Sequence, residues 1–150
     1  MAQIMRIVIK GSSGYCCYDE AYTDRVAITS DSISYEYKPE CESEINPKRK
    51  WSYKTTSPIF CMLFEKLQEM TPAILGRSDI AFCTDVGIIE FTVTFFDKTK
   101  QRKGYYCTGD EFKDYFSTIK QMVPGCEYTP AVLLTSDDYE EEQEKPECRQ

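Results

Sequence analysis

Residues 15–22, Tyr-Cys-Cys-Tyr-Asp-Glu-Ala-Tyr, are the most unusual stretch of the chain and the first candidate for chemistry. Exposed tyrosines on a loop often anchor protein interfaces, because they offer a large contact area for few lost rotamers. The carboxylates here could bind a hard cation such as Ca²⁺, but they lack the regular ligand spacing and the closing glutamate of an EF-hand. An ordinary loop is the alternative interpretation. We predict a partner-binding surface made of Tyr15, Tyr18, Asp19, Glu20 and Tyr22.

The sequence offers no clear catalytic or metal-binding motif. It has eight cysteines and no histidine, which removes the commonest general base. No C-x-x-C pair exists to suggest zinc, and the Cys16-Cys17 pair would need a nearby Lys or Arg to become nucleophilic. Without an export signal we interpret the cysteines as free structural thiols, with Cys61, Cys83 and Cys107 buried. We expect no catalytic residue, no metal and no cofactor, and we lean towards a protein that is not an enzyme.

Two further motifs are weaker candidates. The turn at residues 11–14, Gly-Ser-Ser-Gly, follows a predicted strand but lacks the Gly-Lys-Ser/Thr of a phosphate loop, so we interpret it as a plain turn. Basic residues cluster at 48–50 and 98–103. These clusters could bind nucleic acid beside Trp51 and Tyr105, but the favoured interpretation is that they protect exposed strand ends from edge pairing.

Charge and hydropathy limit the classes of partner. The net charge is −7, so we do not expect binding to the phosphate backbone of a nucleic acid. The same charge favours solubility and attraction to a basic protein. The first ten residues do not resemble a signal peptide, and nothing approaches the ~18 apolar residues of a membrane span. We expect a cytoplasmic location and no membrane association.

Hydrophobic periodicity predicts the elements that would carry these residues. Predicted strands cover 4–10, 25–29, 33–38, 49–55, 80–84, 88–95 and 102–107. In the third strand Ile33, Tyr35 and Tyr37 share one face and Ser34 and Glu36 the other. A helix starts at Pro58, with an apolar stripe of Ile59, Leu63, Leu67 and Met70 beside Phe60 and Phe64. A second helix covers 111–122, and residues 130–134 form an edge strand or a single helical turn.

The two halves of the chain resemble each other. Phe60, Phe64, Leu67, Met70 and Pro72 align with Phe112, Phe116, Ile119, Met122 and Pro124 at a constant offset. A repeat of this size is typical of a duplicated structural unit, whereas two unrelated strand-strand-helix segments are the alternative. We predict an α+β fold with a mainly antiparallel sheet, two helices, a duplicated β-β-β-α unit (25–72 and 79–124) and an extra N-terminal strand.

The domain boundaries and the function follow as expectations. Residues 1–135 are expected to form a single domain, and residues 136–150 an acidic mobile tail because a block of like charges cannot bury surface. We expect a non-enzymatic protein-interaction module that binds another protein, such as an acidic inhibitor or decoy from a mobile element that acts on a nucleic-acid-handling protein. The alternative is a small-ligand-binding or enzymatic domain with a pocket between sheet and helices.

Overall fold

A six-stranded antiparallel sheet forms one layer of the protein. The computed structural model describes residues 3–14, 17–78, 80, 82 and 87–138. The strand order is β4-β3-β2-β1-β5-β6, so the N-terminal strand lies in the middle of the sheet and pairs with β2 on one side and β5 on the other. The strands are β1 (Ile4–Ser12), β2 (Tyr22–Thr29), β3 (Ser32–Pro39), β4 (Arg49–Lys54), β5 (Ile88–Phe95) and β6 (Lys100–Tyr106).

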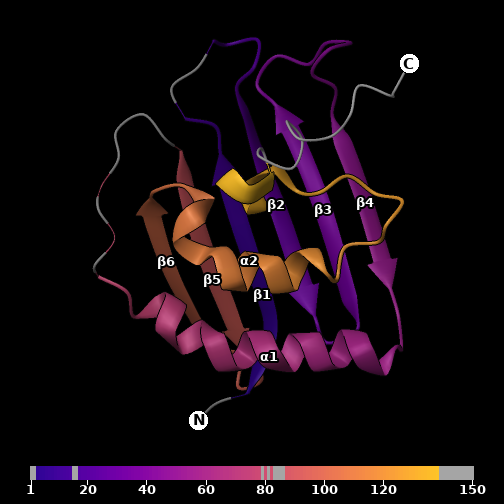
Figure 1. Ribbon diagram of the computed structural model, residues 1–150, viewed down its shortest axis with the longest axis vertical. Helices are drawn as coiled ribbons and strands as arrows, with labels where there is room; N and C mark the ends of the chain where they lie inside the picture. The colour runs from indigo at the N-terminus through magenta and orange to yellow at the C-terminus, as the bar shows by residue number, and fades with distance from the viewer. Residues whose placement is uncertain (1–2, 15–16, 79, 81, 83–86, 139–150) are drawn as a thin grey trace.

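The helices form a second layer on one face of this sheet (Figure 1). The long helix α1 (Pro58–Leu75) and the shorter α2 (Lys113–Lys120) cross the strands side by side, and the 3₁₀ turn η2 (Ala131–Leu133) lies over β1 and β2. A further 3₁₀ turn, η1 (Gly109–Phe112), leads into α2. The opposite face of the sheet is covered by none of the described helices (Figure 1). Among the described residues, no helix is both long and apolar enough to cross a membrane.

The core lies between the two layers. Successive strand residues point to opposite faces, so each strand sends every second side chain towards the helices. Burial of these aliphatic and aromatic side chains is the main stabilising contribution to the fold. The fully or almost fully buried residues include Ile7, Ile9, Val26, Ile28, Ile33, Phe91 and Val93 from the sheet, and Phe64, Leu67, Phe112, Tyr115, Phe116, Ile119 and Leu133 from the helices and 3₁₀ turns.

The α+β prediction is confirmed, and so are most of the predicted elements. Residues 88–95 form a strand with the predicted bounds. Of the two alternatives for residues 130–134, an edge strand or a single helical turn, the structure has the helical turn, η2. The faces predicted for the strand that is now β3 are also confirmed, since Ile33, Tyr35 and Tyr37 are buried among the core residues. The predicted strand 80–84 falls largely outside the described residues, so the duplication stays a prediction, as do the domain boundaries.

Three local predictions are wrong. Ile59 does not pack in the core but is 65% exposed, because the buried face of α1 follows Phe60, Phe64, Leu67, Thr71 and Ile74 instead. Cys61 is exposed for the same reason. Residues 22–24 belong to β2 rather than to the preceding loop, since they pair with the end of β3 and with β1. Cys107 is buried as predicted, and Cys83 lies outside the described residues.

Candidate functional site

The predicted Tyr-rich surface is only partly brought together by the fold. Tyr18, Asp19 and Glu20 lie in an exposed turn between β1 and β2, and Tyr18 is 66% exposed. Tyr22, by contrast, lies in β2 and stacks on Tyr37, with ring centroids 4.9 Å apart. Tyr22 therefore has a packing role, whereas the three residues of the turn face solvent.

This turn is held in place by residues of the β3–β4 connection. The Tyr18 hydroxyl donates a hydrogen bond to the carbonyl of Glu40 at 3.1 Å, and the Asn46 side-chain amide donates to the carbonyl of Asp19 at 3.0 Å. Asn46 is itself buried and accepts a hydrogen bond from the Tyr37 hydroxyl. Tyr15 lies outside the described residues, so the predicted surface as a whole stays a prediction.

A larger surface feature is the helix-free face of the sheet, here called the open face. Its residues are the strand positions that alternate with the core, and cross-strand pairing places them in rows. One row runs Glu90, Lys10, Arg25, Glu36 and Lys50, across β5, β1, β2, β3 and β4. The next row runs Arg102, Thr92, Val8, Ala27, Ser34 and Ser52. Sequence-distant side chains thus share one continuous surface.

The open face is strongly basic although the whole chain is acidic. Eight cations lie on it, of which all but the half-buried Arg6 and Arg25 are exposed. Among the described strand residues, only two carboxylates, Glu36 and Glu90, belong to the same face. The cations are Arg6, Lys10, Arg25, Lys38, Lys50, Lys54, Lys100 and Arg102. An anionic surface would therefore be attracted to this face.

Each of the two carboxylates is paired with a cation of the same face. Glu36 lies 3.4 Å from Lys38, and Glu90 lies 3.8 Å from Arg102. Both pairs are partly exposed, so each contributes little to stability. Lys10 and Arg25 lie opposite each other on β1 and β2, and neither forms an ion pair with any described residue. The centre of the face thus has two adjacent positive charges, with Glu90 opposite Lys10 and Glu36 opposite Arg25 on the neighbouring strands.

The middle of the open face has small side chains. Val8 and Ala27 face each other there, flanked by Thr92 and Ser34, and Val8 and Ala27 are each only 7% exposed. Their low exposure means that the longer side chains around them lie over the sheet, as the aliphatic stems of Lys and Arg commonly do. Six strands at ~4.8 Å spacing and ~8 residues of length give a face of roughly 600 Å².

The two predicted basic clusters lie at the edge strands of the sheet, where Lys and Arg side chains can hinder pairing with another strand. Strands β4 and β6 are the two edges of the sheet, and they carry the clusters at 48–50 and 98–103. Side chains of both clusters divide between the faces. Lys50 and Arg102 point to the open face, whereas Arg49 lies on the helix side, 4.7 Å from the centre of the Tyr128 ring.

The buried carboxylate of Asp24 was not predicted from the sequence. Asp24 of β2 is 4% exposed, and its Oδ2 accepts hydrogen bonds from the Tyr35 hydroxyl and from the backbone N–H of Val132, both at 2.9 Å. Its Oδ1 has no hydrogen-bond partner among the described residues. Burial raises the pKa of Asp24 from 3.8 to about 6, partly offset by these hydrogen bonds. The same burial, together with the nearby Asp24 charge, raises the pKa of Tyr35.

Comparisons of the chain with protein-family models and with curated proteins found no match. A function therefore has to be argued from the geometry and charge of the open face and from the surroundings of Asp24. Fold alone would not supply it, because one fold can carry many functions.

Proposed function

We propose that the protein is a non-enzymatic interaction module whose open sheet face binds an acidic protein. The observation that carries this proposal is the concentration of eight cations against two carboxylates on that face. Glu90 and Glu36, the carboxylates opposite Lys10 and Arg25, form their direct ion pairs with Arg102 and Lys38 instead. An external carboxylate can therefore pair with Lys10 and Arg25 without breaking a direct ion pair between described residues. Such charge complementarity raises the association rate and selects the partner.

The size and shape of the face favour a macromolecular partner. Its area of roughly 600 Å² approaches the ~800 Å² that each side of a standard protein interface buries. The small side chains of Val8, Ala27 and Ser34 lie side by side across three strands at the centre, so no large side chain there would block contact with another folded surface. A single-stranded nucleic acid would instead need aromatic rings on which bases can stack. On the described part of this face, the exposed rings Tyr106 and Phe82 lie against each other at the β6 edge, away from the centre.

The proposal keeps one part of the expectation from sequence and changes another. A non-enzymatic protein-binding module is retained, but the partner that the open face favours is acidic rather than basic. Action as an inhibitor or decoy from a mobile element stays a prediction, and so does the surface around Tyr18. Binding of an acidic protein at the open face can be distinguished experimentally from binding of a basic protein at the Tyr-rich turn. The two surfaces consist of different residues, so separate substitutions affect each of them.

The test is affinity capture from host lysate with the tagged full-length chain and with two charge-reversal variants. In the first, Lys10→Glu and Arg25→Glu reverse the centre of the open face. In the second, the matched control, Lys66→Glu and Lys103→Glu reverse two exposed lysines, one on α1 and one on the helix side of β6. We expect an acidic protein to be captured by the wild type and by the control, and to be lost with the open-face variant. Raising the salt concentration should weaken capture, because ionic contacts are screened.

Two results would contradict the proposal. If both variants capture the same partner as the wild type, the open face is not the binding surface. If capture disappears after nuclease treatment of the lysate, the partner is a nucleic acid. Circular dichroism of each variant checks that the sheet still forms, so that loss of capture is not caused by unfolding.

A further inference from the structure

A cavity of about 390 Å³ lies on the helix side of the sheet, at the end where β1 finishes and β2 begins. Its walls come from four parts of the chain: residues 11–14, residues 87–89, residues 107–110, and the η2 segment 131–136. Asp24 of β2 also lines it. The volume falls within the ~300–1,000 Å³ typical of small-molecule sites.

The walls of this cavity are closely packed backbone. A Cβ atom added to Gly87 would lie 1.7 Å from the Ser12 carbonyl oxygen, and one added to Gly109 would lie 2.4 Å from the Leu134 carbonyl oxygen. Both glycines line the cavity. The segments that enclose it therefore approach each other more closely than any residue with a side chain would allow.

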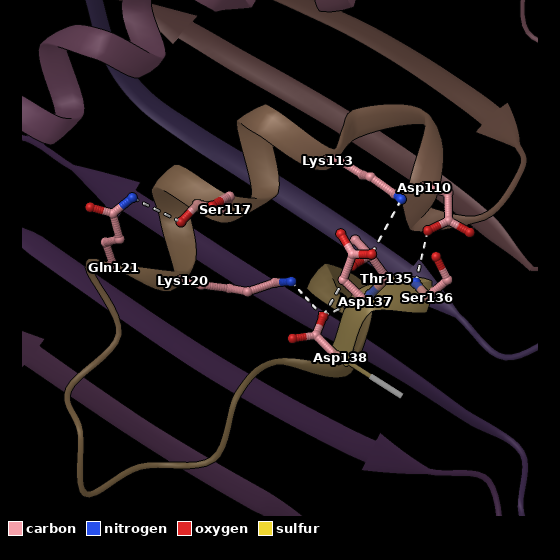
Figure 2. A network of polar contacts seen from close by, with 9 residues as sticks. All are labelled: Asp110, Lys113, Ser117, Lys120, Gln121, Thr135, Ser136, Asp137 and Asp138. Carbon is pink, nitrogen blue, oxygen red and sulfur yellow. Dashed lines mark hydrogen bonds and ion pairs between the residues drawn. The ribbon is translucent and has the colours of Figure 1, made fainter. Parts of the chain in front are cut away.

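Polar contacts fasten the η2 wall to α2 and η1 (Figure 2). The backbone N–H of Ser136 donates to Asp110 Oδ1 at 2.8 Å, and Lys113 pairs with Asp137 at 3.5 Å. The Asp138 carboxylate accepts hydrogen bonds from Lys120 and from the backbone of Thr135. The cavity is therefore bounded on this side by a segment with a defined position.

The charged groups of the cavity are all acidic among its described lining residues. Asp24 lies in its wall, and Asp110 lies at its exposed rim with a pKa lowered by the hydrogen bond from Ser136. No Lys or Arg belongs to the described lining. A hydrogen bond also ties each wall serine to the backbone, since Ser12 and Ser13 accept the N–H groups of Ile88 and Tyr22.

One oxygen of the Asp24 carboxylate, Oδ1, lacks a hydrogen-bond donor among the described residues. A Cβ added to Gly11 would lie 2.6 Å from Asp24 Oδ1, so this oxygen lies directly beneath Gly11 at the cavity wall. Oδ1 is buried and lacks a described hydrogen-bond donor, which is costly for an ionised carboxylate. The Val132 side chain occupies the same space, so a ligand N–H group reaches Oδ1 when that side chain rotates, while the η2 backbone keeps its hydrogen bond to Asp24 Oδ2.

We propose that this cavity binds a small organic cation that carries a primary ammonium group, with Asp24 as its buried counter-ion and Asp110 as a second carboxylate at the rim. The ammonium group supplies the hydrogen-bond donor that Asp24 Oδ1 lacks. A metal ion is a poorer match, because the described residues contain no cluster of three or more metal-ligating side chains. The proposal concerns the helix side of the sheet and is independent of binding at the open face.

The test is a nuclear magnetic resonance titration of the full-length chain at pH 7.0 in cacodylate buffer, which is not an amine and keeps calcium in solution. The probes are n-propylammonium chloride, its neutral counterpart n-propanol, calcium chloride and sodium chloride. We expect saturable shifts of the amide signals of Gly11, Gly109 and Val132 with propylammonium alone. Asp24→Asn should weaken this binding about 10- to 100-fold, as expected for loss of a charged hydrogen-bond partner. The control Asp31→Asn, in the β2–β3 turn, should leave it unchanged.

A second measurement keeps the proposal testable if Asp24→Asn does not fold. Lowering the pH from 7.0 to 5.0 should weaken propylammonium binding to the wild type about tenfold, because Asp24 changes from mostly ionised to mostly protonated around its pKa of about 6. Asp110→Asn, at an exposed position, should weaken binding severalfold. Equal shifts with propanol, a response to calcium alone, or no saturable shift would overturn the proposal.

Discussion

The buried carboxylate of Asp24 predicts an unusual dependence of stability on pH. Its pKa in the folded protein is about 6, against 3.8 for an ordinary aspartate, because burial disfavours the charged form. Between these two values the folded state holds a proton that the unfolded state has lost. The contribution of Asp24 to the free energy of unfolding therefore increases as the pH falls through 6. This contribution disappears as the pH rises back through 6.

The magnitude follows from the two pKa values. Between pH 7.5 and pH 4.5 the linkage relation gives a gain of about 2 kcal/mol from this one group. At pH 7.5 the Asp24 carboxylate is ionised in both the folded and the unfolded state, so its raised pKa adds nothing to stability there. Most paired surface carboxylates act in the opposite direction, because their pKa values are lowered in the folded state.

The measurement is urea unfolding of the wild type and of Asp24→Asn at pH 7.5, 6.5, 5.5 and 4.5. Asparagine cannot titrate, and its amide oxygen can still accept from Tyr35 and Val132. Subtracting the two curves cancels every other titrating group. We expect the wild type to gain about 2 kcal/mol relative to the variant as the pH falls over this range. A flat difference, or one that favours the variant at low pH, would refute the assignment of a raised pKa to Asp24. Amine buffers are avoided, because an ammonium ion in the cavity would lower this pKa.

Three other substitutions test the packing and the hydrogen bonds of the fold. Phe116→Ala removes a fully buried ring between the layers and should lower the free energy of unfolding by about 3–5 kcal/mol in urea titrations. Gly87→Ala would place a Cβ against the Ser12 carbonyl, so we expect a loss of about 3 kcal/mol or more and a lower melting temperature by calorimetry; an unchanged melting temperature would contradict the close approach. Tyr115→Phe removes the 2.9 Å hydrogen bond to Thr71, for which thermal unfolding should show a loss of about 1 kcal/mol; no loss would mean that the pair contributes nothing.

Much of the fold could be predicted from sequence because its signals are local. Alternation in Ile33–Lys38 identified both the strand and its buried face, and Pro58 marked the first residue of α1. The central place of β1 could not be predicted, since chain order does not determine which strands become neighbours. Ile59 was misplaced because apolar residues follow one another at the start of α1. Helical spacing alone therefore allowed an apolar stripe through Ile59 as well as the stripe through Phe60 that is buried in the structure.

The candidate sites were harder to predict because they are made of distant residues. Asp24 is buried by Val132, 108 positions later in the chain, and nothing in the local sequence Tyr-Thr-Asp-Arg signals that contact. The open face combines cations from five of the six strands, all except β5, and the sequence pattern does not say whether helices cover one face of the sheet or both. The charge of Lys10 and Arg25 was visible, but their pairing across β1 and β2 was not.

Lysine reactivity in host lysate tests the central claim, that the open face is the binding surface, without requiring the partner to be known. The tagged chain is acetylated briefly in lysate and in buffer, purified again, and the labelling of each lysine is measured by mass spectrometry. We predict that Lys10, Lys50 and Lys100 are protected in lysate, that Lys66 on α1 is not, and that nuclease treatment leaves the protection intact. Equal labelling of open-face and α1 lysines in lysate and buffer would contradict the account, and protection that nuclease abolishes would contradict a protein partner.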